Sequence, residues 1–237
     1  MGYGRRHAEI YDAVFNGRGK DWAGDAEEVT RLVRARRAGA RSLLDVACGT
    51  GMHLAHFATL FDEVAGIEIA PAMREIAERR LPGVPVHEGD MRDFDLGRTF
   101  DAVVCLSSSI GYLPTTGDLA AAVGRMTAHL TPGGVLLVEP WWFPERFVEG
   151  YVGAHLIRDG DRVIARVSHS TQVGKATHIT VKFVVADPKG IDEFTETEIV
   201  TLFARAEYES AFRKAGCTVE YLPGGPFGRG LFVGTRR

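Results

Sequence analysis

The chain has 237 residues, with 45% hydrophobic and 25% charged residues and a formal net charge of −3 at pH 7. That composition is typical of a globular protein with one large domain, or one domain with a sizeable insertion, and the net charge argues against a nucleic-acid substrate held mainly by electrostatic attraction. No run approaches the roughly 20 apolar residues that a membrane span needs, and Met1–Arg6 lacks the apolar core of a signal peptide, so we expect a cytoplasmic protein without a membrane segment.

Two helical patterns precede the first strand, at His7–Phe15 and Asp21–Ala38. The aromatic residues Tyr11 and Trp22 lie in this region, where they can cover a bound ligand or pack in the core. We expect residues 1–40 to form a helical lid over the ligand-binding end of the protein.

Short apolar runs then alternate with helical patterns. The expected strands are Leu43–Cys48, Val64–Ile69, Pro85–Glu88, Ala102–Leu106 and Val135–Glu139. The expected helices are Met52–Leu60, Pro71–Arg80 and Gly117–Leu130, with Thr131–Gly134 as a stop signal. Strands separated by helices of this length predict a parallel sheet built from βαβ units.

Beyond Pro140 the pattern changes to strands with no helix between them. These strands are Arg162–Thr171, Thr177–Ala186 and Phe194–Phe203, which predict an antiparallel sheet outside the main one. A helix at Ala204–Ala215 and two strands, Thr218–Leu222 and Gly230–Thr235, then complete a seven-stranded sheet whose final pair is antiparallel. We therefore expect an α/β protein with a Rossmann-like core at residues 41–148 and 204–237, and an inserted antiparallel sheet at residues 149–203.

The segment Ser42–Gly51, SLLDVACGTG, is the most informative part of the chain. An apolar strand carrying Asp45 runs into a glycine turn and then into a helix, and Glu68 closes the next apolar run seventeen positions after Gly51. Such a turn presents backbone N–H groups to a ligand, and the later acid accepts hydrogen bonds from ribose hydroxyls. Because Gly49-x-Gly51 has no third glycine, the segment resembles motif I of class I S-adenosylmethionine-dependent methyltransferases rather than an NAD fingerprint.

In an open α/β sheet, ligands bind at the carboxyl ends of the strands, near the point where strand order reverses. The residues that follow the predicted strands are therefore candidates for binding the cofactor. Together with Tyr11 and Trp22, they are Asp45, Ala47, Gly49, Glu68, Ile69, Met73, Asp90, Met91 and Leu106.

Over essentially its whole length the chain resembles the bacterial methyltransferases that methylate the amino group of dTDP-linked deoxyamino sugars. The segments that carry this resemblance are Gly17–Trp22, Leu43–Gly51, Gly89–Phe94, Ser108–Leu113, Glu139–Glu145, Arg166–Ser170 and Pro223–Phe232. The resemblance implies a class I methyltransferase fold with an inserted antiparallel sheet, S-adenosylmethionine as cofactor, a 3-amino-3,6-dideoxyhexose as the first candidate substrate, and a homodimer.

Methyl transfer to an amine requires an unprotonated nitrogen in line with the sulfonium methyl, and no metal. A general base serves only to remove the ammonium proton, which can also leave to water. By resemblance Tyr112 and Tyr3 face the sugar, and they are candidate catalytic residues. His169, in the inserted sheet, is a third candidate, with a structural imidazole as its alternative.

The substrate's diphosphate needs a cation, and Arg229, between two glycines, is the candidate. Ser108 and Trp142, which follow the fourth and fifth strands, are expected to line the sugar or thymine site. Leu106-Ser107 and Phe227 depart from the family pattern, which leaves the sugar and its amine position open; 4-amino sugars and hydroxyl or carbon acceptors remain alternatives. The three cysteines show no paired spacing and predict buried free thiols.

Overall fold

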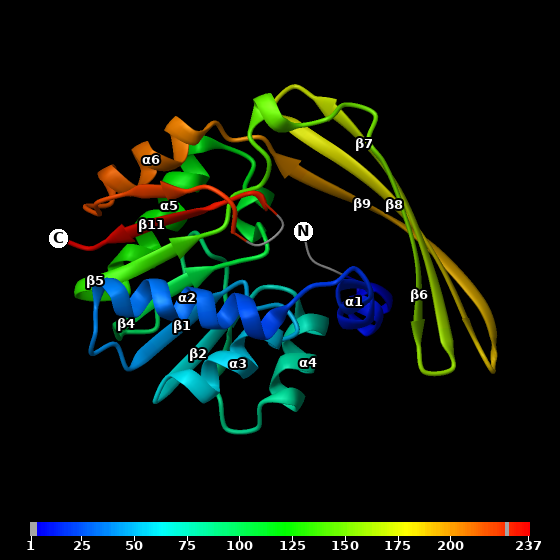
Figure 1. Cartoon of the computed structure of the whole chain (residues 1–237), viewed down its shortest axis with the longest axis horizontal. Helices are drawn as coiled ribbons and strands as arrows, with labels where there is room; N and C mark the ends of the chain where they lie inside the picture. The colour runs from blue at the N-terminus through cyan, green and yellow to red at the C-terminus, as the bar shows by residue number, and fades with distance from the viewer. Residues whose placement is uncertain (1–3, 226–227) are drawn as a thin grey trace.

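The computed structural model describes residues 4–225 and 228–237. A central seven-stranded sheet has the strand order β10-β11-β5-β4-β1-β2-β3 (Figure 1). Its strands are β1 (Ser42–Val46), β2 (Glu63–Glu68), β3 (Val86–Glu88), β4 (Phe100–Cys105), β5 (Leu130–Val138), β10 (Glu220–Leu222) and β11 (Leu231–Thr235). Strands β1 to β5 are mutually parallel, whereas β11 runs antiparallel to both β5 and β10. This topology confirms the predicted fold class.

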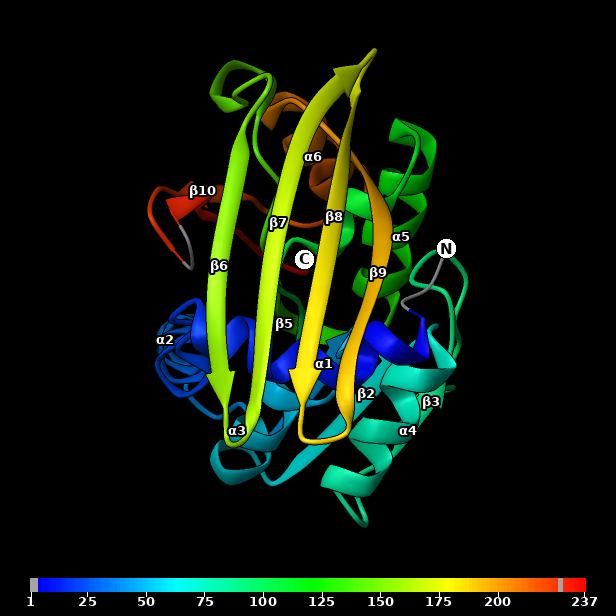
Figure 2. The same ribbon diagram turned by 90° about the vertical axis from the view of Figure 1, so that its right-hand side faces the viewer.

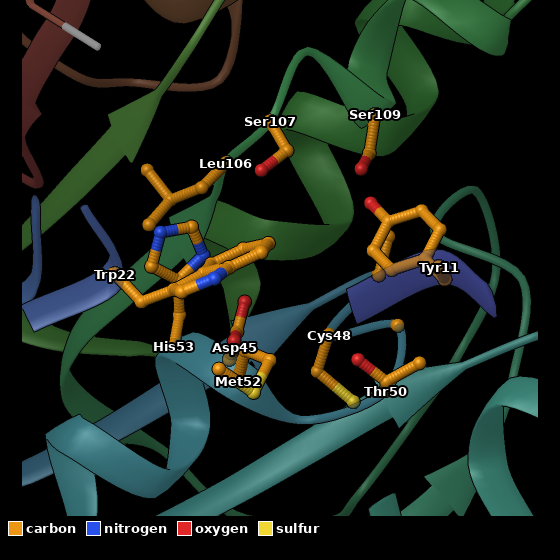
Figure 3. A pocket seen from close by; sticks show the side chains of 12 residues that line it. Tyr11, Trp22, Asp45, Cys48, Thr50, Met52, His53, Leu106, Ser107 and Ser109 are labelled. Atoms are coloured by element: carbon orange, nitrogen blue, oxygen red, sulfur yellow. The ribbon is translucent and has the colours of Figure 1, made fainter. Parts of the chain in front are cut away.

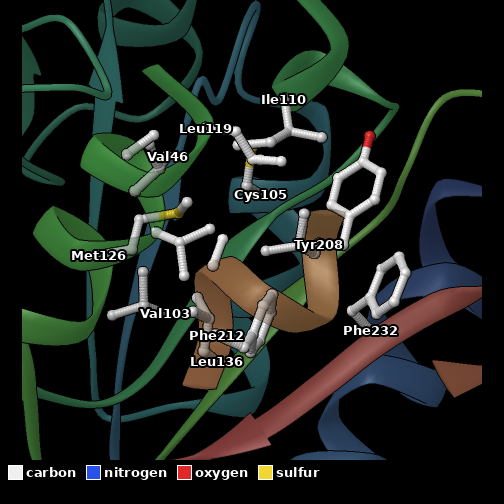
Figure 4. Packing of buried hydrophobic residues seen from close by; sticks show 14 of the residues in the cluster. Val46, Val103, Cys105, Ile110, Leu119, Met126, Leu136, Tyr208, Phe212 and Phe232 are labelled. Carbon is white, nitrogen blue, oxygen red and sulfur yellow. The ribbon is translucent and has the colours of Figure 1, made fainter. Parts of the chain in front are cut away.

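Helices cover both faces of the central sheet, and successive residues along its strands are apolar, as such a buried sheet requires. Leu43 packs under α2 (Trp22–Arg36) and α3 (Met52–Leu60), and Leu44 faces α5 (Thr116–Ala128) and α6 (Arg205–Lys214). Figure 4 shows the second layer, where Tyr208 and Phe212 of α6 pack on Phe232 of β11. The helix α4 (Pro71–Arg80) lies beside β2 and β3 and begins at the predicted proline.

Strand β5 begins earlier than expected. The predicted stop signal Thr131–Gly134 lies inside the strand, and α5 ends at Ala128. Phe100 pairs with Leu130 but Ala102 pairs with Val135, so the extra residues form a bulge. A bulge accommodates a proline and two glycines within a strand, because unpaired residues need not donate to the ladder.

The inserted region forms a second, antiparallel sheet, here called sheet B, with the strand order β6-β7-β8-β9. Its strands are β6 (Val152–Asp159), β7 (Arg162–Val173), β8 (Ala176–Asp187) and β9 (Gly190–Thr201). The last three strands were predicted, whereas β6 was missed. It is an edge strand whose apolar residues Val152 and Leu156 are exposed, so it lacks the buried alternating pattern that marks a strand in sequence.

The helix α1 (Arg5–Gly17) lies between the central sheet and sheet B (Figures 1 and 2). Its residues Ile10 and Val14 pack on the inner face of sheet B, and Ala8 packs on Met73 of α4. The helix therefore occupies the lid position, while α2 covers a face of the central sheet. The division into segments 1–40, 41–148 with 204–237, and 149–203 stays a prediction from the sequence.

All three cysteines are buried and free, as expected. Within the described ranges, no helix combines the length and apolar character needed to cross a membrane.

Candidate active site

A cavity of about 570 Å³ opens between the carboxyl ends of β1, β2 and β4 and the inner face of sheet B. Strand order reverses at β1, which lies between β4 and β2, so the cavity lies at the switch point expected for ligands. A small cavity of about 20 Å³ adjoins it, with Tyr11 and Gly49 in the walls of both (Figure 3). The site therefore has two parts, one at the glycine turn and one under sheet B.

The backbone is left-handed at both strand ends that meet there. After β1, Ala47 has φ of 61° and Gly49 has φ of 59°; after β4, Ser107 and Ser108 have φ of 53° and 60°. Residues with a Cβ adopt this conformation at a cost of about 1–3 kcal/mol, and such residues cluster at ligand sites. The turn is thus held in one shape before any ligand arrives.

Glu68 fixes the glycine turn. Its carboxylate accepts hydrogen bonds from the backbone N–H of Gly49 at 2.8 Å and of Ala70 at 2.7 Å. The side chain is buried, and burial raises the pKa of Glu68 despite these hydrogen bonds. The carboxylate predicted from the sequence to bind a ribose therefore lies beside the turn, in the wall of the large cavity.

Asp45 is a buried acid whose carboxyl group lacks a full set of hydrogen-bond partners. Its Oδ2 has no hydrogen-bond partner among the described residues, and burial, aided by the charge of Glu68, raises the pKa of Asp45 to about 8. An unsatisfied buried carboxyl is costly, so its presence in the wall of the small cavity points to a ligand that brings a positive charge or hydrogen-bond donors.

Aromatic side chains close the small cavity. Trp22 donates a hydrogen bond to Asn16 at 2.7 Å and packs its ring edge against His53, with 4.8 Å between ring centroids. Tyr11 reaches the cavity from α1 (Figure 3). Both predicted aromatic residues thus lie at the cavity.

The other predicted cofactor-binding residues divide into two groups. Those that line one or both cavities are Ala47, Ile69, Met73, Met91 and Leu106. Asp90 lines neither cavity: its carboxylate bonds Arg92, with 2.6 Å between Oδ2 and Nη2, and this contact lowers the pKa of Asp90.

Tyr112 ends the short 3₁₀ helix η1 (Ser109–Tyr112) and faces the large cavity. Its hydroxyl donates a hydrogen bond to Glu198 of β9, a residue that the sequence did not single out. Ser108 also lines the cavity, but its hydroxyl donates to the carbonyl of Pro140 at 2.7 Å. Trp142 lines the same cavity.

Arg229 lines the large cavity and forms a buried ion pair. It donates to Oε1 of Glu139 at 2.7 Å, and its guanidinium lies 5.2 Å from the ring centroid of Trp141 and 5.8 Å from that of Trp142. The Glu139 side chain is fully buried and also accepts from the backbone N–H of Ser107. Much of the charge of Arg229 is therefore already balanced.

Three further arginines line the cavity: Arg18, Arg146 and Arg166. Nε of Arg18 is buried without a hydrogen-bond partner in the part of the chain that the structure describes, and burial lowers the pKa of Arg18. Burial and the charge of Arg18 together lower the pKa of Arg166. Sequence reasoning missed this cluster, although Arg18 and Arg166 lie inside the two segments Gly17–Trp22 and Arg166–Ser170.

His169, a candidate catalytic residue from the sequence, does not line the cavity. It is exposed on the outer face of sheet B, while Arg166, Ser168 and Ser170 of the same strand face the cavity. Side chains alternate along a strand, so His169 and Ser168 cannot share a face. Tyr3 lies outside the described residues.

Comparison with known proteins agrees with this geometry. Residues 43–134 match the family model described as a methyltransferase domain. A curated Streptomyces venezuelae protein, dTDP-3-amino-3,4,6-trideoxy-alpha-D-glucopyranose N,N-dimethyltransferase, is 56% identical over 96% of this chain and 97% of its own length. The Saccharopolyspora spinosa dTDP-4-amino-2,3,4,6-tetradeoxy-D-glucose N,N-dimethyltransferase is 53% identical, over 99% of this chain and 94% of its own.

Solved structures give the same result. The crystal structure of Streptomyces venezuelae DesVI has a TM-score of 0.96 at 55% identity and covers 98% of both chains. Fold and site together define a class I S-adenosylmethionine-dependent methyltransferase, and the orphan Asp45 and the preformed glycine turn fit that cofactor. More narrowly, the chain belongs to the family of N-methyltransferases of dTDP-linked amino-deoxysugars.

A second solved relative is the S-adenosylmethionine-bound CalS10, an amino pentose methyltransferase from Micromonospora echinaspora. It has a TM-score of 0.91 at 53% identity and covers 96% of this chain and 97% of its own. The cofactor of this protein is S-adenosylmethionine, and its enzyme class is N-methyltransferase.

Proposed function

We propose that the protein transfers a methyl group from S-adenosylmethionine to the amino group of a dTDP-linked 3-amino-3,6-dideoxyhexose. The observation that carries this proposal is the two-part cavity, in which a glycine turn with two buried acids adjoins a chamber lined by four arginines, Arg18, Arg146, Arg166 and Arg229. The end at the glycine turn suits a cationic nucleoside that extends from the small cavity into the large one past Glu68, and the end lined by arginines suits a sugar nucleotide with a diphosphate.

S-adenosylmethionine, when bound, supplies a sulfonium methyl group that is already electrophilic. We assign Glu68 to its ribose hydroxyls and Asp45 to its positive charge, and Gly49, which has open space where a side chain would be, lets the cofactor approach the backbone of the turn. Ala47, Ile69, Met73, Met91 and Leu106 would form the apolar walls. Tyr11 and Trp22 would exclude water, so that the amine is the nucleophile nearest the methyl group.

We assign the diphosphate to the arginine cluster. Arg18 supports this assignment best, because its buried Nε is without a partner among the described residues and an anion would supply one. Arg229 would contribute through the guanidinium nitrogens that Glu139 does not bind, and Trp142 would offer a face for the thymine or the sugar. Ser108 would close the wall beside the sugar.

The homodimer implied by the family resemblance also belongs to this proposal. The outer face of sheet B exposes Val152, Leu156 and Val167 at 66%, 77% and 53%. Three of the strands have twelve residues and β6 has eight, so at a spacing of about 4.8 Å one face of sheet B covers roughly 700 Å². A standard interface buries about 600–1,000 Å² per partner, so one face of this sheet is within that range.

A specific observation favours one alternative acceptor. The Saccharopolyspora spinosa relative, named for a 4-amino sugar, is nearly as similar as the two relatives named for 3-amino sugars, at 53% against 56% and 52% identity. Overall similarity therefore does not select the amine position, and a 4-amino sugar is the second candidate.

Mass spectrometry of products tests both. The enzyme is incubated with S-adenosylmethionine and either dTDP-3-amino-3,6-dideoxyglucose or its 4-amino isomer. Gain of one or two methyl groups on the 3-amino compound alone is the expected result. Gain on the 4-amino compound alone would move the assignment to the second candidate. A methylated product that still reacts as a primary amine would point instead to a hydroxyl or carbon acceptor.

A further inference from the structure

The pair Tyr112–Glu198 in the wall of the large cavity is not explained by cofactor or diphosphate binding. Tyr112 comes from η1, directly after the end of β4, and Glu198 comes from β9 of sheet B. The Tyr112 hydroxyl donates a hydrogen bond to the Glu198 carboxylate, and both side chains line the cavity. The pair therefore joins the two sheets at the place where the acceptor amine must meet the methyl donor.

The backbone holds this pair firmly. Gly111, next to Tyr112, packs so closely that a Cβ there would come within 2.6 Å of Cγ1 of Val200 and 3.0 Å of Cβ of Trp141. Val200 is two residues beyond Glu198 on the same strand and belongs to the buried core of sheet B. Close packing of η1 on β9 fixes the hydroxyl relative to the carboxylate.

Glu198 faces titratable groups from every element around it. They are His7 and Tyr11 of α1, Arg18 of the following loop, Tyr112 of η1, Arg166 of β7 and Glu196 of β9 itself. Burial has the largest effect, and it raises the pKa of Glu198 although His7, Arg166 and Tyr112 act to lower it. A carboxylate of this kind is a stronger base than one in water.

The proposed reaction releases a proton that such a base can accept in place of water. When the amine lone pair attacks the sulfonium methyl, an N–C bond forms, the C–S bond breaks and its electron pair stays on sulfur, which leaves a neutral thioether. The nitrogen becomes an ammonium that still carries an N–H proton. A second methylation of the same nitrogen requires that this proton leave.

We propose that Glu198 is the acceptor of this proton, which it receives through the Tyr112 hydroxyl: the ammonium N–H passes its proton to Oη of Tyr112 as the Tyr112 O–H proton moves to Glu198. Charge balances, because an ammonium and a carboxylate become an amine and a carboxylic acid. The inference rests on the proposed amino-group acceptor. Tyr112 is then the group that touches the amine, and Glu198 acts through it.

Diphosphate binding would strengthen this base. Arg166 lowers the pKa of Glu198 by its positive charge, and Arg18 interacts with the same carboxylate. An anion bound to these two guanidinium groups would offset that charge and raise the pKa of Glu198 further. The base would thus become effective when the sugar nucleotide is in place.

The test compares Glu198→Gln, Tyr112→Phe and the double variant. Loss of a positioned base costs about 10²–10⁴-fold in rate, so each single variant should lower kcat near pH 7 by about 100-fold, and the rate should recover as pH rises. Because the two residues act as one relay, the double variant should be no slower than either single variant. Monomethylated product should accumulate in all three.

Binding provides a second measurement that does not depend on turnover. Calorimetry with the amino-sugar nucleotide and with the matching hydroxyl-sugar nucleotide should show a preference for the amine in the wild type and loss of that preference in Glu198→Gln. The control Glu193→Gln, an exposed carboxylate paired with Lys182 on the outer face of sheet B, should change neither kinetics nor binding.

Three results would overturn the proposal: an unchanged pH profile in Glu198→Gln, additive losses in the double variant, or an equal effect of Glu196→Gln, which would show that the wall acts only by its general charge. Failure of the proposed function is distinguishable, because the wild-type enzyme would then leave every amino-sugar nucleotide unmethylated.

Discussion

The buried carboxyl of Asp45 is expected to favour cofactor binding but to lower the stability of the cofactor-free fold. Its pKa of about 8 in the folded protein lies above its usual value of 3.8, so between these pH values the folded state binds more protons than the unfolded state. The free energy of unfolding of the cofactor-free protein therefore falls as pH rises from about 4 to about 8.

Replacing Asp45 with Asn should therefore stabilise the cofactor-free protein and abolish cofactor binding. An amide cannot ionise, so the variant avoids the free-energy cost of ionising a buried carboxyl, which is on the order of a few kcal/mol at pH 8. Thermal denaturation should show a higher Tm for the variant at both pH 6 and pH 8, with the larger difference at pH 8, and S-adenosylmethionine should raise the Tm of the wild type alone. Tight cofactor binding by the variant would contradict the assignment of Asp45.

Arg229 combines a proposed role in binding with a structural role. Arg229→Ala should raise KM for the sugar nucleotide and leave the affinity for S-adenosylmethionine nearly unchanged. It should also cost about 3–5 kcal/mol of stability, because Glu139 remains fully buried without its charged partner. Arg18, half-buried and without an ion-pair partner of this kind in the described chain, allows a cleaner test.

The two arginine variants should therefore differ. Arg18→Ala should raise KM at little cost in Tm, whereas adding Glu139→Gln to Arg229→Ala should restore part of the Tm but not the KM. Initial-rate kinetics and denaturation on the same preparations make the comparison. If KM in the double variant recovers to the wild-type value together with Tm, Arg229 acts only as a structural ion pair.

At the scale of elements, the sequence predicts the helices and strands whose apolar residues follow a regular pattern. The apolar runs and the glycine turn placed the first four parallel strands and α4 closely, because their signals are local. The bulge in β5 was missed because a proline with two glycines reads as a turn unless the neighbouring strand is known. In β7 we predicted His169 as a site residue because histidine is a common base. Alternation along the strand from the buried Ile164 instead places Arg166, Ser168 and Ser170 on the inner face.

The lid helix α1 is held to the glycine turn by one polar cluster. Asp12 accepts a hydrogen bond from the Thr50 hydroxyl at 2.5 Å and pairs with Arg80 of α4, which also donates to the carbonyl of Thr50. The side chains of Asp12 and Arg80 are about a quarter exposed, so their ion pair should contribute at most about 1 kcal/mol to overall stability.

Asp12→Ala should therefore loosen the lid without unfolding the core. We expect a severalfold faster release of S-adenosylmethionine with a Tm close to that of the wild type, measured by stopped-flow displacement and calorimetry. Glu9→Ala, an exposed carboxylate one turn earlier on the same helix, is the control. If both variants release the cofactor equally fast, the charge of the helix matters and the Asp12 contact does not.

At the scale of the whole molecule, the site forms where segments far apart in sequence meet. Gly49, Tyr112, Glu198 and Arg229 come from a turn, a 3₁₀ helix, sheet B and the loop before β11, and each lines one cavity. Motif patterns identified the first part of the cavity. In the second part the sequence identified Tyr112, Ser108, Trp142 and Arg229 but missed Arg18, Arg166 and Glu198, because their place in the wall depends on how sheet B closes over the strand ends.

Sheet B has a second face, which Figure 2 presents to the viewer, and the proposed dimer uses it. Leu156 and Val167 lie on this outer face, since Ala154 pairs with Val167 and the pairs His155–Arg166 and Gly153–Ser168 face the cavity. Apolar side chains exposed side by side on a sheet favour burial against a partner.

Introducing like charges there should separate the two copies. We expect Leu156→Glu combined with Val167→Glu to give a monomer in light scattering while the affinity for S-adenosylmethionine stays unchanged, because neither side chain faces the cavity. The control is Ile191→Glu, a residue equally exposed at 77% on the opposite edge strand. A wild-type protein that is monomeric at all concentrations would remove the dimer from the proposal, and dissociation by Ile191→Glu alone would move the interface from β6 and β7 to β9.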